Sequence, residues 1–284
     1  MSVLESLMAR KLDGVSKHFS DPQLIYSGFS AINPTCPSGQ GNVYHYNESG
    51  GTRQNVAIKK YLIIEGSKDE KLVESEIITM AKCGQHQNIL RLHSIYIYHG
   101  CVFLVTPYCN GGTLQQYCID NWVTLSQMVS ILKGLLSGLV EIHKHGYIHR
   151  DIKCENFFLG EDNTIVIGGF GFSSLKPIVK PSSEEAGDIL FWAPEVCEGK
   201  FINQKADIWA LGIVVLKILN FGKAPYEDDH LEKGKLKRKI IEQGRPHYPR
   251  NMNDLLMDFV DRCLKPDYSQ RASASELLEE QFNT

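Results

Sequence analysis

The residues best suited to do chemistry lie in one short stretch in the middle of the chain. Asp151 is followed two residues later by Lys153 and five residues later by Asn156. In phosphoryl transfer, an Asp accepts the proton of the attacking hydroxyl, a Lys neutralises the transferring group and an Asn holds Mg²⁺. The spacing therefore predicts a phosphoryl-transfer loop in which these three residues have these three roles.

A second stretch should supply a carboxylate for the metal, and it supplies a glycine. The segment from Tyr147 to Asn156 resembles the catalytic loop of eukaryotic protein kinases, whose long signature is H-R-D-x-K-x-x-N. Where that family has Asp-Phe-Gly, this chain has Gly169, Phe170 and Gly171. Gly168 has no side chain that could substitute. The resemblance implies ATP as the nucleotide, with Mg²⁺ bound weakly or not at all and Asn156 as the one remaining side-chain ligand.

The absence of this carboxylate has a large kinetic consequence. Loss of the charge stabilisation that a metal ion supplies would slow transfer by roughly 10²- to 10⁴-fold or more. The alternative interpretation is that Gly169 is an ordinary loop glycine in a working enzyme.

A lysine on a predicted strand should grip the nucleotide phosphates. Val56-Ala57-Ile58-Lys59 is similar to the kinase strand that carries this Lys. The Lys needs a Glu from the following helix, and the residue count favours Glu76 over the alternative, Glu74. With Glu76 in that role, Met80 falls one helical turn later, where the resemblance places it in an apolar column with Phe170 and His149.

The nucleotide-covering loop is poor in glycine. The family's three glycine positions fall at Cys36, Ser38 and Gly41, and side chains at the first two obstruct close approach of the backbone to phosphates. The segment from Val105 to Gly112 resembles the hinge strand that binds adenine in kinases. Adenine would bind the carbonyl of Pro107 and the amide of Cys109, and proline still has the carbonyl oxygen that this requires. The resemblance gives these nucleotide-binding residues: Gly41, Val43, Ala57, Lys59, Glu76, Thr106, Pro107, Cys109 and Phe158, the last of which would narrow the pocket.

Other family positions concern regulation and framework. Gly187 matches the substrate-binding loop, but Asp188 replaces the Thr of Ser/Thr kinases. Glu184 occupies the usual activating phosphorylation position, where its charge would pair with Arg150; plain solvent exposure of Glu184 is the alternative. The framework residues implied by the resemblance are His149, Glu195, Asp207 and Arg271, with Asp207 buttressing the catalytic loop and Arg271 pairing with Glu195.

Composition describes an ordinary globular chain. It has 284 residues, 43% hydrophobic and 22% charged, with a net charge of −3. This balance predicts no general attraction to nucleic acid or to membranes. The local basic run from Lys233 to Lys239 is a solvated helix face or, alternatively, a docking patch. The eight cysteines have no paired spacing and indicate a cytoplasmic location, with the nucleus as an alternative. Zinc binding by His143, His145, His149 and Cys154 is a weaker alternative.

The pattern of elements predicts an α+β, bilobal fold, and the resemblance implies that this is the kinase-like fold. Apolar residues at helical spacing predict a flanking helix over residues 1–22. Residues 23–107 predict a small sheet lobe, with strands over 42–44 and 55–61, a hairpin over 95–105 and one helix over 69–83. Residues 108–284 predict a helical lobe, with a capping box at Thr124 and Gln127 and a buried core helix over 207–219.

Two kinase branches share features with the chain. The catalytic loop and the Asp207 to Gly212 segment resemble NIMA-related kinases, whereas Thr106-Pro107 and the glycine at the metal position are similar to STRAD-type pseudokinases of the sterile-twenty group. The resemblance implies a pseudokinase that acts as an adaptor or allosteric regulator of a signalling protein, such as an active kinase or a scaffold. The alternatives are a weakly active Ser/Thr kinase and a kinase-shaped scaffold that binds no nucleotide.

Overall fold

The chain divides into two compact units. The computed structural model describes residues 9–33, 42–48, 55–64, 67–175, 177–178 and 186–282. Unit 1 comprises Met1–Asn110 with Gly169–Gly171, and unit 2 comprises Gly111–Gly168 with Phe172–Thr284. The change of unit after Asn110 lies close to the predicted boundary at residue 107.

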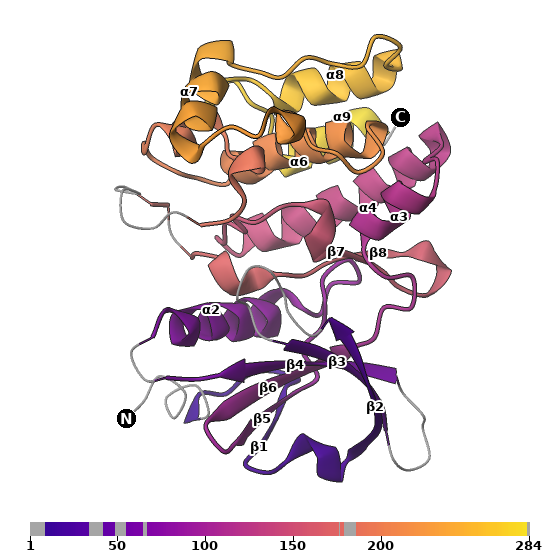
Figure 1. Ribbon diagram of the computed structural model, residues 1–284, viewed down its shortest axis with the longest axis vertical. Helices are drawn as coiled ribbons and strands as arrows, with labels where there is room; N and C mark the ends of the chain where they lie inside the picture. The colour runs from indigo at the N-terminus through magenta and orange to yellow at the C-terminus, as the bar shows by residue number, and fades with distance from the viewer. Residues whose placement is uncertain are drawn as a thin grey trace. The chain divides into compact units, whose positions relative to one another are not determined.

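Unit 1 is a six-stranded sheet with one long helix (Figure 1). The strand order is β1-β5-β6-β4-β3-β2, with β1 parallel to β5 and every other pair antiparallel. The elements are β1 (Ser16–His18), η1 (Pro22–Leu24), β2 (Tyr26–Asn33), β3 (Asn42–Glu48), β4 (Asn55–Leu62), α2 (Lys68–Cys83), β5 (Ser94–Tyr98) and β6 (Cys101–Pro107). The predicted strands, hairpin and helix of this lobe are confirmed.

The two faces of this sheet carry different side chains, because successive residues of a strand point to opposite faces. On one face, Lys59 and Tyr61 of β4 contact Glu76 of α2. On the other face, Val56, Ile58, Tyr96 and Val105 form a buried cluster, against which Tyr26, Tyr44 and Phe103 pack. The alternation along β4 therefore places Lys59 and Tyr61 on the face toward Glu76 and the buried cluster on the other face. Both faces carry buried apolar side chains, since Leu104, directly opposite Lys59, is 1% exposed.

The predicted flanking helix is wrong for part of its range. Ser16–His18 form β1, which pairs in parallel with Ser94–Tyr96 of β5. The Ser16 amide donates to the His93 carbonyl at 3.0 Å, so the edge of the sheet offers this segment a hydrogen-bonding partner that outweighs its helical spacing. Residues 1–8, which carry most of the apolar pattern, lie outside the described residues.

Unit 2 is mainly helical (Figure 1). Its helices are α3 (Leu114–Asp120), α4 (Leu125–Lys144), α5 (Pro194–Cys197), α6 (Lys205–Leu219), α7 (Lys233–Gln243), α8 (Asp254–Cys263) and α9 (Ala274–Phe282). Short 3₁₀ turns are η2 (Cys154–Asn156), η3 (Glu161–Asn163), η6 (Ile189–Phe191) and η7 (Glu227–Asp229), while η4 (Phe170–Phe172) straddles the division between the units. A small antiparallel ribbon of β7 (Phe157–Leu159) and β8 (Ile165–Ile167) follows the catalytic loop.

Helices α4 and α6 form the centre of unit 2. Every residue of α6 from Ala206 to Ile218 is buried, which confirms the predicted core helix. Helix α4 is long and apolar enough to cross a membrane by length and composition alone. However, its apolar stripe, which includes Met128, Leu132 and Leu139, is buried inside this unit, as expected of a core helix.

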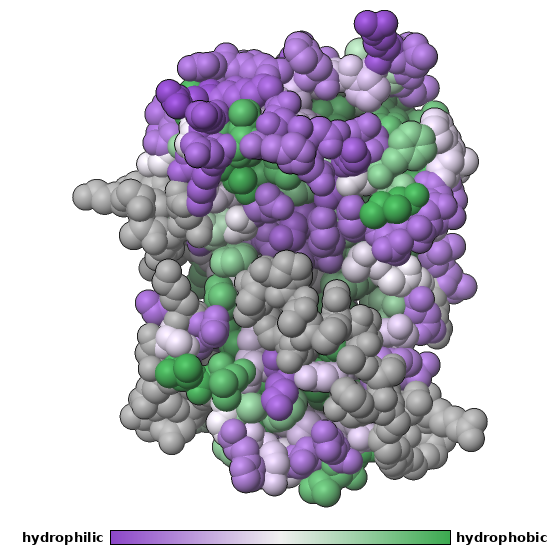
Figure 2. All heavy atoms as spheres, in the orientation of Figure 1, coloured by the Kyte–Doolittle hydropathy of each residue, from purple (hydrophilic) through white to green (hydrophobic). Residues whose placement is uncertain are grey.

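The basic run forms helix α7, as one of its two interpretations predicts. Leu236 and Ile240 are buried, whereas Lys235 and Arg238 are exposed. Figure 2 shows mostly hydrophilic residues over this part of unit 2. Lys239 pairs with Asp229 at 2.7 Å, so part of the local positive charge is already neutralised.

Helix α4 begins with the predicted capping box. The Gln127 amide donates to Thr124 Oγ1 at 3.3 Å, and the Thr124 amide donates to Gln127 Oε1 at 2.9 Å. These two bonds satisfy amides that a helix N-terminus otherwise leaves unpaired. The helix ends at Lys144, and Gly146 follows with a left-handed φ of 83°.

We expect Thr124→Ala to lower the free energy of unfolding by about 1 kcal/mol, because it removes the cap of α4. Ser130→Ala is the matched control, since Ser130 is exposed inside the same helix, where Ala is the better helix former. Urea denaturation followed by circular dichroism measures both. Equal effects of the two substitutions would contradict a role for the cap.

Candidate active site

The catalytic loop of unit 2 is held by a buried carboxylate from α6. Asp207 is 1% exposed, and its two oxygens accept the amides of His149 at 2.8 Å and Arg150 at 2.9 Å. His143 of α4 places its Nε2 2.8 Å from the same carboxylate. One side chain thus fixes the backbone immediately before Asp151, as the sequence predicts for Asp207.

Opposing influences act on the pKa of Asp207. Burial alone would raise the pKa of this carboxyl, but the hydrogen bond and charge of His143 and the Arg150 amide hold it below its usual value. Asp207 is therefore ionised at neutral pH, and a charged acceptor makes stronger hydrogen bonds to the loop than a neutral one.

His149 is a buried, neutral linker within the loop. Its Nε2 lies 2.9 Å from the Gly168 carbonyl, and its Nδ1 accepts the Asp151 amide at 3.2 Å. Burial lowers the pKa of His149, partly opposed by the charges of Asp207 and Asp151. The neutral tautomer with a proton on Nε2 satisfies both contacts and ties the loop to the backbone just before Gly169.

The predicted catalytic trio is assembled in unit 2. Asp151 is 4% exposed, and Lys153 Nζ lies 3.2 Å from its Oδ1. The Asn156 amide group donates to the Asp151 carbonyl at 2.7 Å and to Oδ2 at 2.8 Å. The trio can therefore accept a hydroxyl proton beside a positive charge, and Asn156 Oδ1 remains to accept a donor or a cation.

The Lys59 partner in unit 1 is Glu76, as predicted. Lys59 Nζ lies 3.1 Å from both oxygens of Glu76, which is 4% exposed. Tyr61 also donates its hydroxyl to Glu76 Oε2, and the Lys59 ammonium lies 5.0 Å from the centre of the Tyr61 ring. The alternative, Glu74, makes no contact of this kind among the described residues. The role of Tyr61 was not predicted, although its place two residues after Lys59 puts both on one face of β4.

The other expected nucleotide residues occupy their predicted elements. Val43 lies on β3, Ala57 on β4, and Thr106 and Pro107 on β6, where the Thr106 hydroxyl donates to the Ala57 carbonyl at 3.4 Å. Cys109 follows β6 and is half-buried; burial raises the pKa of its thiol to about 11. In unit 2, Phe158 pairs with Val166 across the ribbon. Cys36, Ser38 and Gly41 lie outside the described residues, so the loop prediction is untested.

The predicted ion pair between Arg271 and Glu195 is present in unit 2. Arg271 and Glu195 form a two-pronged ion pair, with nitrogen–oxygen distances of 2.7 and 3.0 Å, and both residues are almost fully buried. The Arg271 guanidinium also donates to the carbonyls of Lys205 and Lys265. This pair thus joins α5 to the loop before α9, as predicted, and has a structural role. Glu184 lies outside the described residues, and its proposed pairing with Arg150 stays a prediction.

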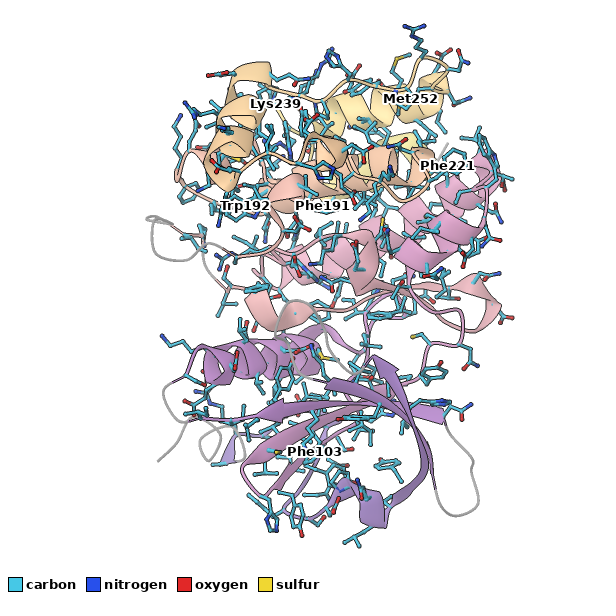
Figure 3. The ribbon with its side chains drawn as sticks, viewed as in Figure 1. Phe103, Phe191, Trp192, Phe221, Lys239 and Met252 are labelled. Atoms are coloured by element: carbon cyan, nitrogen blue, oxygen red, sulfur yellow. The ribbon has the colours of Figure 1, made fainter. Side chains whose placement is uncertain are left out.

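Gly187 and Asp188 have local structural roles. Gly187 has a φ of 79°, and a Cβ there would lie 2.3 Å from the Arg150 carbonyl oxygen and 3.2 Å from Asp151 Oδ1. Only glycine therefore fits this close approach to the catalytic loop. Asp188 accepts the Leu190 amide at 3.1 Å and so caps η6. A pocket of about 290 Å³ lies beside these residues, with Asp151, Trp192 and Lys237 in its lining (Figure 3 labels Trp192).

Comparison with known proteins agrees with this geometry. A family model described as the protein kinase domain matches residues 38–283. This chain belongs to the protein kinase family. The fold of a sheet lobe and a helical lobe is therefore the kinase fold.

Sequence relatives of this kinase domain include sterile-twenty and PAK kinases. Serine/threonine-protein kinase MST20 of Pyricularia oryzae is 33% identical over 92% of the chain and 28% of its own length. Shk1/pak1 of Schizosaccharomyces pombe is 29% identical over 98% of the chain and 41% of its own length. PAK 1 of Mus musculus is 30% identical over 92% of the chain and 47% of its own length. The chain thus spans less than half the length of these relatives.

Gly169 lies where the resemblance places the metal-binding Asp of the family, and this assignment stays a prediction. This residue has a φ of 76°, a value that glycine adopts without strain, and it has no side-chain oxygen to offer a metal. Phe170 beside it is fully buried. The predicted column of Met80, Phe170 and His149 draws on both units and stays a prediction, although each of these three residues is buried.

The histidines considered for zinc each have another partner. His143 lies on Asp207, His145 Nε2 lies 2.9 Å from Glu141, and His149 contacts the Gly168 carbonyl. Over the described ranges, no group of three His, Cys, Asp or Glu side chains is placed to hold a metal ion. The sequence did not predict another ion pair: the buried Lys217 of α6 contacts the partly exposed Glu155 of the catalytic loop at 2.6 Å. A lysine inside an otherwise apolar helix is the signal that could have revealed it.

We expect Asp207→Asn to destabilise the protein most at neutral pH. Because the folded-state pKa of Asp207 is lowered, its charge contributes stability above the unfolded pKa, near 4, and this contribution is lost as the pH falls through the folded pKa. The difference in unfolding free energy between wild type and variant should therefore shrink in acid. Denaturant titrations from neutral pH to about pH 3 measure it.

Asp162→Asn is the control for this titration, because Asp162 is exposed at a left-handed turn position that Asn also tolerates. A difference between wild type and Asp207→Asn that stays constant with pH would refute the role of the buried charge.

Proposed function

We propose that this kinase domain is a pseudokinase, impaired in phosphoryl transfer, that regulates a signalling partner by binding it. The observation that carries the proposal is the triplet Gly169-Phe170-Gly171, which stands where the resemblance implies Asp-Phe-Gly. Glycine offers a metal no side-chain oxygen, whatever conformation the protein adopts. Gly168 shares this lack, so no neighbouring residue of the motif compensates.

The residues present do not fit the metal site that kinases use. Mg²⁺ requires near-octahedral oxygen coordination and is usually held by one or two carboxylates with substrate phosphates and waters. Asn156 can offer its Oδ1, but the Asp151 carboxylate is already engaged by Lys153 and Asn156. We therefore assign no catalytic step to Mg²⁺, and propose that ATP, where it binds, binds weakly or without metal.

The intact framework argues for a binding role. Lys59 and Glu76 remain paired, Asp207 holds the catalytic loop, and Arg271 remains paired with Glu195. Buried ion pairs of this kind are costly to break and do not by themselves perform chemistry. Their retention beside a lost metal ligand supports a protein that keeps a kinase shape for recognition. Its partner is proposed to be an active kinase or a scaffold protein.

We expect ATP to raise the melting temperature by the same amount with and without Mg²⁺, because no carboxylate at residue 169 couples the metal to the nucleotide. Lys59→Met should remove this stabilisation. A radiolabelled phosphate-transfer assay on the same samples should show only background. Mg²⁺-dependent transfer that Asp151→Asn abolishes would overturn the proposal, and no stabilisation by any adenine nucleotide would favour the scaffold that binds none.

A slow Ser/Thr kinase is the second candidate, favoured by one observation. Asp151, Lys153 and Asn156 are assembled with hydrogen-bond distances suitable for proton acceptance and charge neutralisation. The relatives named above are serine/threonine-protein kinases. This candidate predicts a measurable rate in the wild type that Gly169→Asp raises by roughly 10²-fold or more, through the restored metal ligand. For the pseudokinase, wild-type transfer stays at background.

A further inference from the structure

A pocket, here called the sheet pocket, lies on the face of the unit 1 sheet that carries the buried cluster around Ile58. Directly opposed residues of paired strands share a face, and the pairs Lys60–Phe103 and Tyr98–Cys101 lie opposite one another. The sheet pocket has a volume of about 310 Å³. Its lining comprises Asp21, Gln23, Tyr44, Lys60, Tyr98, His99, Cys101 and Phe103. These residues all belong to unit 1, on the sheet face opposite Lys59, Glu76 and α2.

Lys60 places a positively charged side chain in the lining of the sheet pocket. The side chain is half-buried, and its ammonium lies 5.6 Å from the centre of the Phe103 ring. Within the part of the chain that the structure describes, Lys60 makes no ion pair with a carboxylate. Lysines are seldom buried unless paired, because removing the charge from water is costly. An anionic group bound in the pocket would supply the missing partner.

Aromatic side chains form the walls around this charge. Phe103, labelled in Figure 3, packs with Tyr44 against the buried cluster that includes Ile58, Tyr96 and Val105. Tyr98 is 39% exposed, and its ring lies 4.1 Å from that of His99, centre to centre. Flat apolar groups pack well against such rings, edge to face or offset.

Asp21 limits the charge that the ligand can carry. Its Oδ1 accepts the Gln23 amide at 2.9 Å, so a carboxylate is fixed in the lining of the pocket. One lysine and one carboxylate together give no excess positive charge. This balance disfavours polyphosphates and nucleic acid, so a ligand that binds Lys60 should carry no more than one negative charge, held at the ammonium and away from Asp21.

We propose that the sheet pocket binds a small aromatic monocarboxylate, with its carboxylate on Lys60 and its ring between Tyr44, Tyr98 and Phe103. The pocket volume suits one such molecule, and pockets of this kind are mostly apolar with a few polar groups that set orientation. The free acid and the C-terminal aromatic residue of a short peptide share this chemistry. The inference concerns unit 1 alone and does not depend on whether the protein transfers phosphate.

The test uses 3-phenylpropanoate with the whole chain, followed by saturation-transfer and amide NMR. We expect amide shifts at Tyr98, His99 and Phe103, and no binding of the neutral 3-phenylpropanamide. Lys60→Gln should weaken binding roughly tenfold or more, because a hydrogen bond to a charged group is lost. Lys71→Gln is the matched control, since Lys71 is exposed on α2. Comparing the affinity of a dipeptide that ends in Phe with that of 3-phenylpropanoate shows whether the pocket prefers a peptide C-terminus or the free acid.

Tyr98→Ala provides a second variant that should fold, because the Tyr98 ring is partly exposed; it should also weaken binding. Amide spectra of each variant report whether it is folded. The proposal is overturned if 3-phenylpropanoate does not bind at about 10 mM. It is equally overturned if the shifts map away from the sheet pocket, or if Lys60→Gln and Lys71→Gln bind alike.

Discussion

The active-site loop depends on one buried carboxylate. Asp207 accepts two consecutive backbone amides, those of His149 and Arg150, and it receives a third contact from His143. Arg150 has a left-handed φ of 67°, which costs energy for a residue with a side chain, so the loop needs an external constraint to hold this shape. Asp207 supplies the constraint from the most buried helix of unit 2. The positions of Asp151, Lys153 and Asn156 follow from it.

In unit 1, the buried carboxylate of Glu76 likewise accepts hydrogen bonds from two residues, and here it joins a helix to the sheet. Glu76 accepts from both Lys59 and Tyr61, so a single carboxylate joins α2 to two residues of β4. This polar contact adds to apolar burial on the same face, where Val102 and Leu104 lie directly opposite Tyr61 and Lys59. Lys59 and Tyr61 can share one acceptor because residues two apart on a strand point to the same face.

Patterns with a local cause, or those that a family motif names, were predictable from the sequence. The capping box at Thr124, the core helix around Trp209, and the pairing of Arg271 with Glu195 all follow from spacing or from family motifs. Strand β1 was missed, because its partner at His93 is distant in sequence and the apolar spacing before it favours a helix. Tyr61 and Lys217 were missed for a related reason: each is defined by a carboxylate from another element, Glu76 or Glu155. Single-sequence patterns reveal such tertiary partners only where a family motif names them.

The shared acceptor at Glu76 has a practical consequence for experiments on this protein. Removing the Lys59 ammonium leaves Glu76 with the Tyr61 hydroxyl, so the glutamate is not stranded as an unpaired buried charge. Helix α2 therefore retains an anchor in a chain that has lost its phosphate-gripping lysine. A substitution at Lys59 can therefore test nucleotide binding while Glu76 keeps a hydrogen-bonding partner in Tyr61.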